Sequence, residues 1–280
     1  MAAGREKLRQ AGISEPEAAL DARLLAQWLL GWDAARFFAS ANEEPRATFQ
    51  PNYDQFIERR ANREPMAYIY AGQEFYGRMF EVTPAVLIPR PETEIIVEAA
   101  LSVLPNQART RVADIGTGSG CLAITIACER PLARILATDI SHDALEIALR
   151  NARRHEVDAR VSLAAGDLLP PPMAGDPVFD LIVSNPPYVP EGDQPSLAPE
   201  VRDYEPAGAL FAGQDGLDVI RRLIAVSAER LAPGGYLIFE IGIDQDAAVT
   251  QLISTTPDLR MVGLRNDLQG IPRTVVVQRT

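Results

Sequence analysis

Three groups of residues in this sequence have the types and the spacing that cofactor and substrate chemistry requires. The first is Gly116-Thr117-Gly118-Ser119-Gly120, which directly follows an apolar run ending at Ile115. Glycine at alternate positions lets the backbone turn sharply and leaves no side chain between a ligand and the start of the next helix. We therefore expect this loop to bind a nucleotide-like ligand.

The second group is a single carboxylate, Asp139, which lies 23 residues after Gly116 at the end of the next expected strand. An acid in that place can accept hydrogen bonds from both hydroxyls of a ribose. Loop and acid together indicate a ribose-bearing cofactor, and the same geometry would suit NAD. The loop reads Gly-x-Gly-x-Gly rather than Gly-x-Gly-x-x-Gly, which favours a cofactor other than a dinucleotide.

The third group is Asn185-Pro186-Pro187-Tyr188, which follows the apolar run 179–184. Two prolines fix the backbone and remove two N–H donors, so acceptors are left at the carboxyl edge of the sheet. Such a site suits an amide or exocyclic amino nitrogen, held by the Asn185 side-chain oxygen and the Pro186 carbonyl while Tyr188 stacks on the planar group. No strong base is needed, because the proton can leave once the nitrogen is cationic. Positioning alone contributes about 7–11 kcal/mol to such a step.

The hydrophobic pattern predicts the framework that brings these groups together. From residue 5 to about residue 63 apolar residues recur at helical spacing, which indicates a small helical bundle. Short extended pieces at 74–80 and 86–88, separated by glycines and prolines, are typical of a hairpin-like connector. After Thr93, strands alternate with helices, which predicts a mostly parallel sheet covered on both faces. The expected strands are 112–115, 135–138, 161–164, 179–184, 236–240, 261–264 and 274–278.

Composition excludes several classes of protein. Lys7 is the only lysine, so neither a catalytic lysine elsewhere nor a Walker loop is available. Two cysteines seven residues apart and two histidines support neither a disulfide framework nor a zinc site, and we expect no metal. The sequence contains no uninterrupted apolar run of about 18 residues, so we expect no membrane span. The first ten residues carry charges instead of an apolar signal core, so we expect a cytoplasmic protein.

The distribution of charge divides the chain. The formal net charge is −11, but the first 90 residues carry 11 basic and 12 acidic side chains and the remainder carries 16 and 26. The acidity therefore belongs to the alternating strand and helix region, which disfavours binding to a phosphate backbone. The nearly neutral N-terminal region is the better candidate for contact with RNA or an acidic protein.

Asn-Pro-Pro-Tyr beside a nucleotide loop is typical of S-adenosylmethionine-dependent methyltransferases that act on planar nitrogens in DNA, RNA or protein. Over nearly its whole length the chain closely resembles one such family, the release factor glutamine methyltransferases of the PrmC/HemK type. Its specific part is Pro89-Arg90-Pro91-Glu92-Thr93-Glu94, which general amino-methyltransferases do not share. The other segments that carry the resemblance are 63–65, Tyr68, Gly72, 74–77, Leu87-Ile88, 114–121, 138–141, 179–188, Glu205-Pro206 and 213–217.

The resemblance implies three parts and one reaction. Residues 1–72 would be a helical substrate-recognition domain, 73–91 a β-hairpin linker, and 92–280 a seven-stranded Rossmann-like, S-adenosylmethionine-dependent methyltransferase domain of the α/β class. The reaction would be N5-methylation of the glutamine in the Gly-Gly-Gln loop of bacterial-type peptide chain release factors, with S-adenosylhomocysteine as product. We expect a monomer that contacts neither nucleic acid nor membrane.

The resemblance also assigns residues. Cofactor contacts are implied for Gly116, Thr117, Gly118, Ser119, Gly120, Asp139, Asp167, Leu168 and Asn185. Substrate contacts are implied for Asn185, Pro186, Pro187 and Tyr188, with Asn185, Pro186 and Tyr188 as the catalytic residues. Some relatives have an aromatic residue where this chain has Leu168, so we expect apolar packing there rather than stacking on adenine. Arg90 and Glu92 either order a lid over the cofactor or form a plain salt bridge.

Other functions remain open from the residues alone. A DNA or RNA amino-methyltransferase, acting on adenine or guanine, should present a basic surface, which the acidic C-terminal region disfavours. A non-catalytic S-adenosylmethionine-binding protein and a nicotinamide-dependent oxidoreductase could share the fold, but neither needs residues 185–188.

Overall fold

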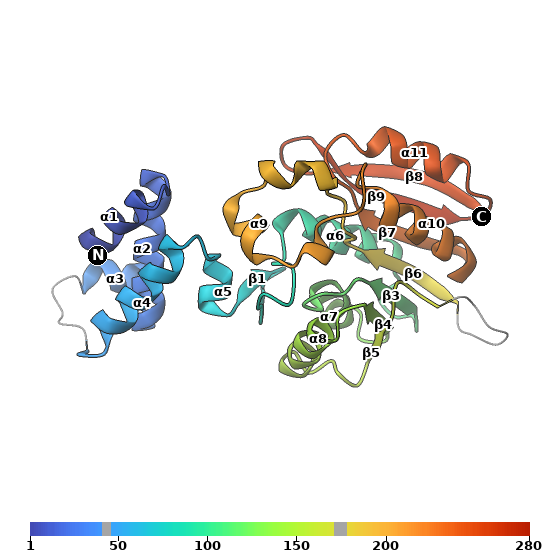
Figure 1. Ribbon diagram of the computed structural model, residues 1–280. Coiled ribbons are helices and arrows are strands. Elements are labelled where there is room, and N and C mark those ends of the chain that lie inside the picture. Colours follow the sequence, from blue (N-terminus) through green and yellow to red (C-terminus); the bar gives the residue numbers. More distant parts are fainter. Residues whose placement is uncertain (41–45, 171–177) are drawn as a thin grey trace. The chain divides into compact units, whose positions relative to one another are not determined.

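The computed structural model describes residues 1–40, 46–170 and 178–280, and these residues form two compact units. The helical unit consists of residues 1–72 together with Ala198–Tyr204. The sheet unit consists of Gln73–Leu197 and Glu205–Thr280. The helical unit therefore includes a short segment that the chain supplies from within the sheet unit's sequence. Figure 1 shows the elements of each unit by label and colour.

The helical unit is a small bundle, as its apolar spacing predicts. Its helices are α1 (Ala2–Gln10), α2 (Glu15–Leu30), α3 (Ala34–Ala39), α4 (Phe49–Ala61), α5 (Met66–Tyr70) and the inserted α9 (Pro199–Tyr204). Helix α2 begins with Pro16 in its first turn and ends at Gly31, whose φ of 65° suits a left-handed cap. Leu8, Leu25 and Ile57 are buried between α1, α2 and α4.

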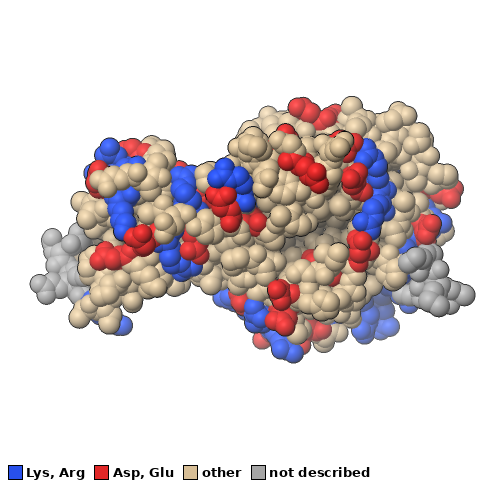
Figure 2. All heavy atoms as spheres, in the orientation of Figure 1, with Lys and Arg blue, Asp and Glu red and all other residues tan. Residues whose placement is uncertain are grey.

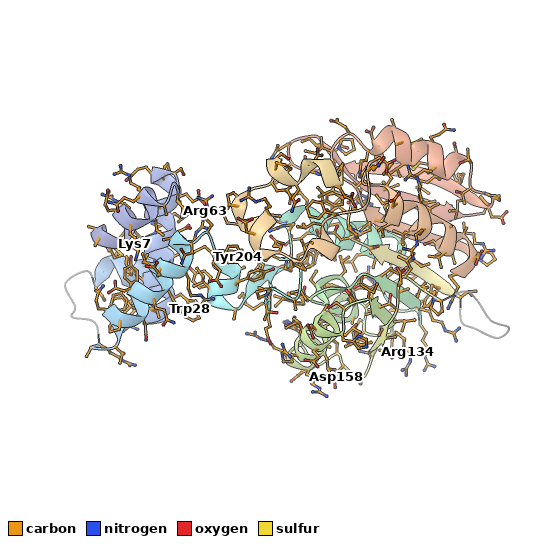
Figure 3. All side chains as sticks on the ribbon, in the orientation of Figure 1. Lys7, Trp28, Arg63, Arg134, Asp158 and Tyr204 are labelled. Carbon is orange, nitrogen blue, oxygen red and sulfur yellow. The ribbon has the colours of Figure 1, made fainter. Side chains whose placement is uncertain are left out.

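A buried arginine joins the inserted helix to the rest of this bundle. Arg60 is 3% exposed and donates to Asp21, Glu17 and Glu200 at 2.7, 2.7 and 2.8 Å. Glu200 also accepts from Arg63, and the Tyr204 hydroxyl donates to the Asn62 carbonyl (Figure 3). A buried cation is tolerated when carboxylates surround it in this way. The network explains why the helix from residue 199 to 204 belongs to this unit.

The sheet unit begins with a hairpin. Strands β1 (Gln73–Phe75) and β2 (Arg78–Phe80) pair antiparallel around Tyr76 and Gly77, whose φ values are 51° and 72°. Positive φ at both central residues is the geometry of a tight two-residue hairpin turn. The expected extended piece at 86–88 does not pair as a strand. Its Val86 N–H donates to the Thr83 carbonyl in a turn that starts before Pro84, and proline at that position favours a turn.

In the part of the chain that the structure describes, the main sheet has seven strands in the order β5-β4-β3-β6-β7-β9-β8. Its strands are β3 (Arg111–Ile115), β4 (Arg134–Asp139), β5 (Val161–Ala165), β6 (Phe179–Ser184), β7 (Leu231–Glu240), β8 (Leu259–Asn266) and β9 (Pro272–Arg279). The first five are parallel, whereas β9 runs antiparallel to both β7 and β8. Strands β4 and β5 lie on one side of β3, and the strands that follow them in the chain lie on the other side, beginning with β6. Ligands of α/β sheets bind where the strand order reverses in this way.

Helices cover both faces of this sheet, which confirms the expected α/β fold. Helices α6 (Glu94–Val103), α7 (Cys121–Glu129) and α8 (His142–Arg154) supply one core, and α10 (Asp218–Arg230) and α11 (Asp246–Ser254) supply the other. Neighbouring strand residues alternate between the two: Leu181 and Val183 lie in the first core and Ile182 in the second. Strands buried on both faces need continuous apolar runs, which is the pattern seen in the sequence. The described part of this unit also contains the 3₁₀ turns η1 (Pro91–Thr93), η2 (Glu191–Ser196) and η3 (Ala207–Ala209).

Candidate active site

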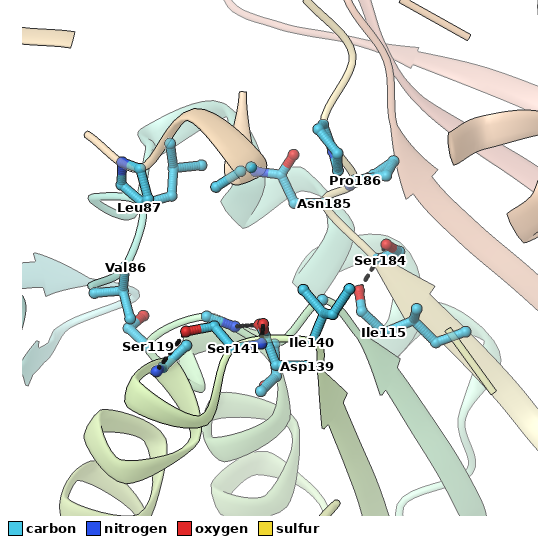
Figure 4. Close-up of a pocket in the computed structure, with 18 of the residues that line it drawn as sticks. Val86, Leu87, Ile115, Ser119, Asp139, Ile140, Ser141, Ser184, Asn185 and Pro186 are labelled. Atoms are coloured by element: carbon cyan, nitrogen blue, oxygen red, sulfur yellow. Dashed lines mark hydrogen bonds between the residues drawn. The ribbon is translucent and has the colours of Figure 1, made fainter. Parts of the chain in front are cut away.

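A cavity of about 360 Å³ lies at the carboxyl ends of β3, β4 and β6. Figure 4 shows Asn185 and Pro186 at one side of it and Asp139 and Ile140 at another. The predicted site residues that line the cavity are Gly116, Thr117, Gly118, Ser119, Asp139, Asp167, Leu168, Asn185, Pro186 and Pro187. The remaining two, Gly120 and Tyr188, are not among the lining residues. The topology thus brings ten of the twelve together although they follow four different strands.

The glycine loop turns the chain from β3 into α7. Gly116, Gly118 and Gly120 have φ values of 70°, 55° and 82°, which side chains disfavour. The N–H groups of Gly116 and Thr117 both donate to the Thr138 carbonyl at 2.9 Å, which ties the loop to the end of β4. No atom would lie within 4 Å of a Cβ at Gly116 or Gly118, so these two glycines face open space.

Gly120 serves packing instead of ligand access. A Cβ there would lie 2.8 Å from Ile124 Cδ1 and 3.3 Å from the Ala148 Cβ. The residue precedes α7, and its backbone lies close to α8. The third glycine of the loop is therefore required by the approach of two helices.

Asp139 is held by backbone donors on both of its oxygens. Oδ2 accepts from the Gly118 N–H at 2.8 Å, and Oδ1 accepts from the Ser141 N–H at 2.9 Å. Each carboxylate oxygen can accept more than one hydrogen bond, so both retain capacity for a ligand. The side chain thus both fixes the glycine loop and lines the cavity.

Beneath the loop lies a second acid, Asp114, to which the sequence motifs assigned no individual role. It is fully buried, and its Oδ2 accepts from the Thr117 hydroxyl at 2.6 Å and from the Ala123 N–H at 3.1 Å. Burial raises the pKa of Asp114 to about 7, against the opposing effect of these two hydrogen bonds. Burial likewise raises the pKa of the neighbouring Cys121 to about 12, so this thiol is not a nucleophile.

Leu168 and Asp167 form the far wall of the cavity after β5. Leu168 has a φ of 67°, lines the cavity and packs against the core on the α10 side. Asp167 forms an ion pair with Arg222 at 2.6 Å, and Arg222 also lines the cavity. Apolar packing of Leu168 against adenine stays a prediction.

The segment before η1 lines the cavity as well, through Ala85, Val86, Leu87 and Pro89. It is anchored by Glu205, whose buried carboxylate accepts from the Ile88 N–H at 3.2 Å and from the Arg90 guanidinium. Arg90 therefore secures this segment through an ion pair. The part assigned to Glu92 stays a prediction.

Asn185 opens the motif after β6 and is oriented by hydrogen bonds. Its Nδ2 donates to the Thr93 Oγ1 at 3.0 Å, and the Thr93 hydroxyl donates to Glu240 Oε2 at 2.7 Å. Tyr188 donates to the other Glu240 oxygen at 3.0 Å. Thr93 and Glu240 are therefore part of the site. Thr93 lies in the family motif 89–94 and Glu240 ends an expected strand, but no sequence pattern links either of them to Asn185, from which 92 and 55 residues separate them.

The backbone of the motif is fixed from the other side. Gln245 Nε2 donates to the Tyr188 carbonyl at 3.0 Å, while its Oε1 accepts from the Gly242 N–H at 2.8 Å. Gly216 allows this contact, because a Cβ there would lie 2.2 Å from the Tyr188 carbonyl oxygen. The Pro186 carbonyl accepts no hydrogen bond from the described residues. It stays available to a donor, whereas stacking by Tyr188 stays a prediction.

Two classes of site can be checked directly in the residues that the structure describes. Within 1–40, 46–170 and 178–280, no group of three or more His, Cys, Asp or Glu side chains could hold a metal ion. None of the helices formed by those residues is long and apolar enough to cross a membrane.

Comparison with known proteins matches both parts of the chain. Residues 1–70 match the PrmC N-terminal domain family, and residues 94–200 match the methyltransferase small domain family. A release factor glutamine methyltransferase of Koribacter versatilis is 44% identical over 261 residues, which cover 93% of this chain and 91% of that protein. One from Geobacter sulfurreducens is 45% identical, covering 84% and 82%. Among solved structures, a methyltransferase from Pyrococcus furiosus shares the fold with a TM-score of 0.55 at 16% identity, covering 79% of this chain and 98% of that one.

Proposed function

This chain belongs to the release factor glutamine methyltransferase family, and from this premise we propose how its cavity methylates a glutamine side chain. The acceptor is the amide nitrogen of the glutamine in the Gly-Gly-Gln loop of a peptide chain release factor. The methyl donor is S-adenosylmethionine, which the residues that line the cavity would hold. The observation that carries the proposal is a pair of acceptors at the cavity edge, the Asn185 Oδ1 and the Pro186 carbonyl, to which no described residue donates a hydrogen bond.

The cavity has the donors and acceptors that this cofactor needs. Asp139 offers two carboxylate oxygens, already aligned by Gly118 and Ser141, to the ribose hydroxyls. Gly116 and Gly118 leave the loop open to close approach of the ligand. Leu168, Ile140 and Val86 give apolar walls for the base. S-adenosylmethionine supplies an electrophilic methyl group when bound.

Asn185 and Pro186 act on the acceptor. A glutamine side-chain amide has two N–H donors, and these match one acceptor each on Asn185 and Pro186. Holding both N–H groups turns the face of the planar nitrogen toward the methyl donor. Because an amide nitrogen is a weak nucleophile, most of the help must come from positioning, which contributes up to about 7–11 kcal/mol.

No general base is assigned among these residues. Glu240, the nearest carboxylate of the network, is occupied by Thr93 and Tyr188 and is fully buried. The nitrogen becomes acidic only after it has gained the methyl group, and its proton can then leave to water. Asn185, Pro186 and Tyr188 therefore work by holding the amide rather than by removing its proton.

The helical unit is assigned to recognition of the release factor. It matches the PrmC N-terminal domain family and contains none of the residues that line the cavity. In the face shown in Figure 2, acidic and basic side chains are interspersed over both units. We assign the protein to the cytoplasm, as a monomer that binds release factor directly without nucleic acid.

The test is mass spectrometry of purified release factor after incubation with this protein and S-adenosylmethionine. The expected result is a gain of about 14 Da that maps to the loop glutamine, because one methyl group replaces one hydrogen. A release factor in which that glutamine is replaced by asparagine is the matched control and should gain nothing. Unmodified release factor together with methylated DNA or RNA in parallel reactions would overturn the proposal.

A further inference from the structure

Two buried side chains behind Asn185 have no part in the reaction as described so far. Thr93 is 2% exposed and lies at the end of η1, and Glu240 is 1% exposed and lies at the end of β7. A carboxylate buried so completely is costly unless its oxygens are hydrogen-bonded. Here the two oxygens accept from two hydroxyls, Thr93 at 2.7 Å and Tyr188 at 3.0 Å.

Burial raises the pKa of Glu240, and the hydrogen bonds from Thr93 and Tyr188 and the charge of Arg273 oppose this. With Glu240 ionised, these contacts fix the direction of the two hydrogen bonds that join Asn185, Thr93 and Glu240. A threonine hydroxyl has a single hydrogen, and Thr93 gives it to Glu240. Its oxygen can then only accept from Asn185, so the NH₂ end of the Asn185 amide must face Thr93. The Asn185 Oδ1 is thereby turned away from Thr93, where it is free to accept from another group.

The position of Thr93 on its helix supports a role in the site. Thr93 immediately precedes α6, at the position where threonine commonly caps a helix through its side chain. Its side chain makes no such cap bond in this structure. The hydroxyl instead connects two residues that are 92 and 147 positions away in the chain.

We propose that Thr93 and Glu240 are positioning residues, which hold the Asn185 amide with its oxygen toward the substrate nitrogen. This inference rests on the proposed function, because the orientation matters only for an acceptor that donates N–H groups. Without the Thr93 hydroxyl, the Asn185 amide could rotate by half a turn and present its own N–H groups to those of the substrate. The hydrogen bond from Thr93 to the Glu240 carboxylate polarises the bond from Asn185 to Thr93. This polarisation makes the Asn185 Oδ1 a stronger acceptor.

The decisive variant is Thr93→Val, which keeps the shape of the side chain and removes the hydroxyl. We expect kcat for release factor methylation to fall about 10- to 100-fold, the range seen when a group that orients a site residue is removed. Thr93 lines the cavity, but its described side-chain hydrogen bonds go to Asn185 and Glu240 and none goes to Asp139 or the glycine loop. The Kd for S-adenosylmethionine, measured by calorimetry, should therefore stay within about twofold. Thr93→Ser keeps the hydroxyl and should recover most of the lost kcat.

Thr274→Val is the matched control. Thr274 is buried beside Glu240 in the β7 and β9 register, and its hydroxyl has no hydrogen-bond partner among the residues that the structure describes. Replacing it by valine makes the same chemical change in the same region without touching Asn185. Its kcat and Kd should equal those of the unchanged protein.

Glu240→Gln tests the second proposed positioning residue. It also keeps the proposal testable if Thr93→Val does not fold. A glutamine has one acceptor oxygen where Glu240 has two, so one of its hydroxyl partners must reverse. We expect kcat to fall, and the double variant with Thr93→Val to lose less than the product of the two single losses, because Glu240 acts on Asn185 through Thr93 and on Tyr188 directly.

Wild-type kcat in Thr93→Val would overturn the inference, and so would equal losses in Thr93→Val and Thr93→Ser. Independent, additive losses in the double variant would overturn the assignment of Glu240. Failure of the unchanged protein to methylate release factor would instead contradict the proposed function, so the two failures are distinguishable.

Discussion

The two sides of the cavity are built in different ways. The cofactor side is made from short stretches of chain, in which Asp139 and the loop 116–120 are held mostly by backbone hydrogen bonds within β3, β4 and their turns. The acceptor side depends on side chains from distant segments, because Asn185 is held by Thr93 and Thr93 by Glu240. A site that binds by backbone shape can be encoded locally, whereas a site that orients an amide needs partners from several elements.

The comparison is tested most strongly at Asn185. Asn185→Ala removes the acceptor on the substrate side, and we expect the methyl transfer rate to fall about 100- to 1,000-fold, as when one aligned hydrogen-bonding group is lost from an active site. The Kd for S-adenosylmethionine should change by only about two- to threefold. The exposed Asn106→Ala serves as the control in the same assays and should change neither quantity. Loss of cofactor binding with no separate effect on transfer would show that the two sides are not distinct.

The glycine loop offers a matched pair of substitutions on the cofactor side. Gly120→Ala places a Cβ 2.8 Å from Ile124 at a φ of 82°, whereas Gly118→Ala meets no atom within 4 Å at a φ of 55°. We expect Gly120→Ala to lower the free energy of unfolding by about 2–4 kcal/mol, from overpacking and backbone strain together. Gly118→Ala should lower it by about 1–2 kcal/mol, from strain alone. Urea unfolding measures both, and equal losses would contradict the packing role of Gly120.

Asp139 should affect binding rather than transfer. Asp139→Ala removes a charged acceptor for the ribose hydroxyls and should raise the Kd for S-adenosylmethionine about 10- to 50-fold, equivalent to about 1.4–2.3 kcal/mol. Calorimetry measures this directly. Asp143→Ala, an exposed carboxylate in the first turn of α8, is the control and should leave the Kd unchanged. An unchanged Kd in Asp139→Ala would remove this carboxylate from the cofactor site.

The raised pKa of Asp114, beneath the glycine loop on the cofactor side, should make the stability of the fold depend on pH. Its pKa is raised to about 7 in the folded protein, so the folded state keeps a proton that the unfolded chain loses near pH 4. Raising the pH through that interval therefore destabilises the folded state relative to Asp114→Asn, which cannot titrate. Between about pH 5.5 and 7.5 the stability of the unchanged protein relative to the variant should fall by about 1–2 kcal/mol. Urea unfolding at the two pH values checks the sign, and a rise would contradict it.

The same contrast explains what could be predicted from the sequence. The strands of the sheet and the loop 116–120 follow from apolar runs and glycine spacing, both of which are local signals. Thr93 appears in a family motif, and Glu240 ends an expected strand, but no periodicity links either of them to Asn185. The helix at 199–204 joins the helical unit through Glu200 and Arg60, a pairing across 140 residues that only the folded chain reveals. The piece at 86–88 pairs with no strand, because the turn from Thr83 to Val86 occupies its start.

The most direct test of the division between the two sides is the single-turnover rate of release factor methylation at saturating S-adenosylmethionine, in Asp139→Ala and Asn185→Ala side by side. Asp139→Ala should recover nearly the rate of the unchanged protein, since excess cofactor compensates for weaker binding. Asn185→Ala should stay at least about 100-fold slower, because no concentration of cofactor restores the lost alignment of the amide. Recovery of both variants at saturation, or of neither, would contradict this account.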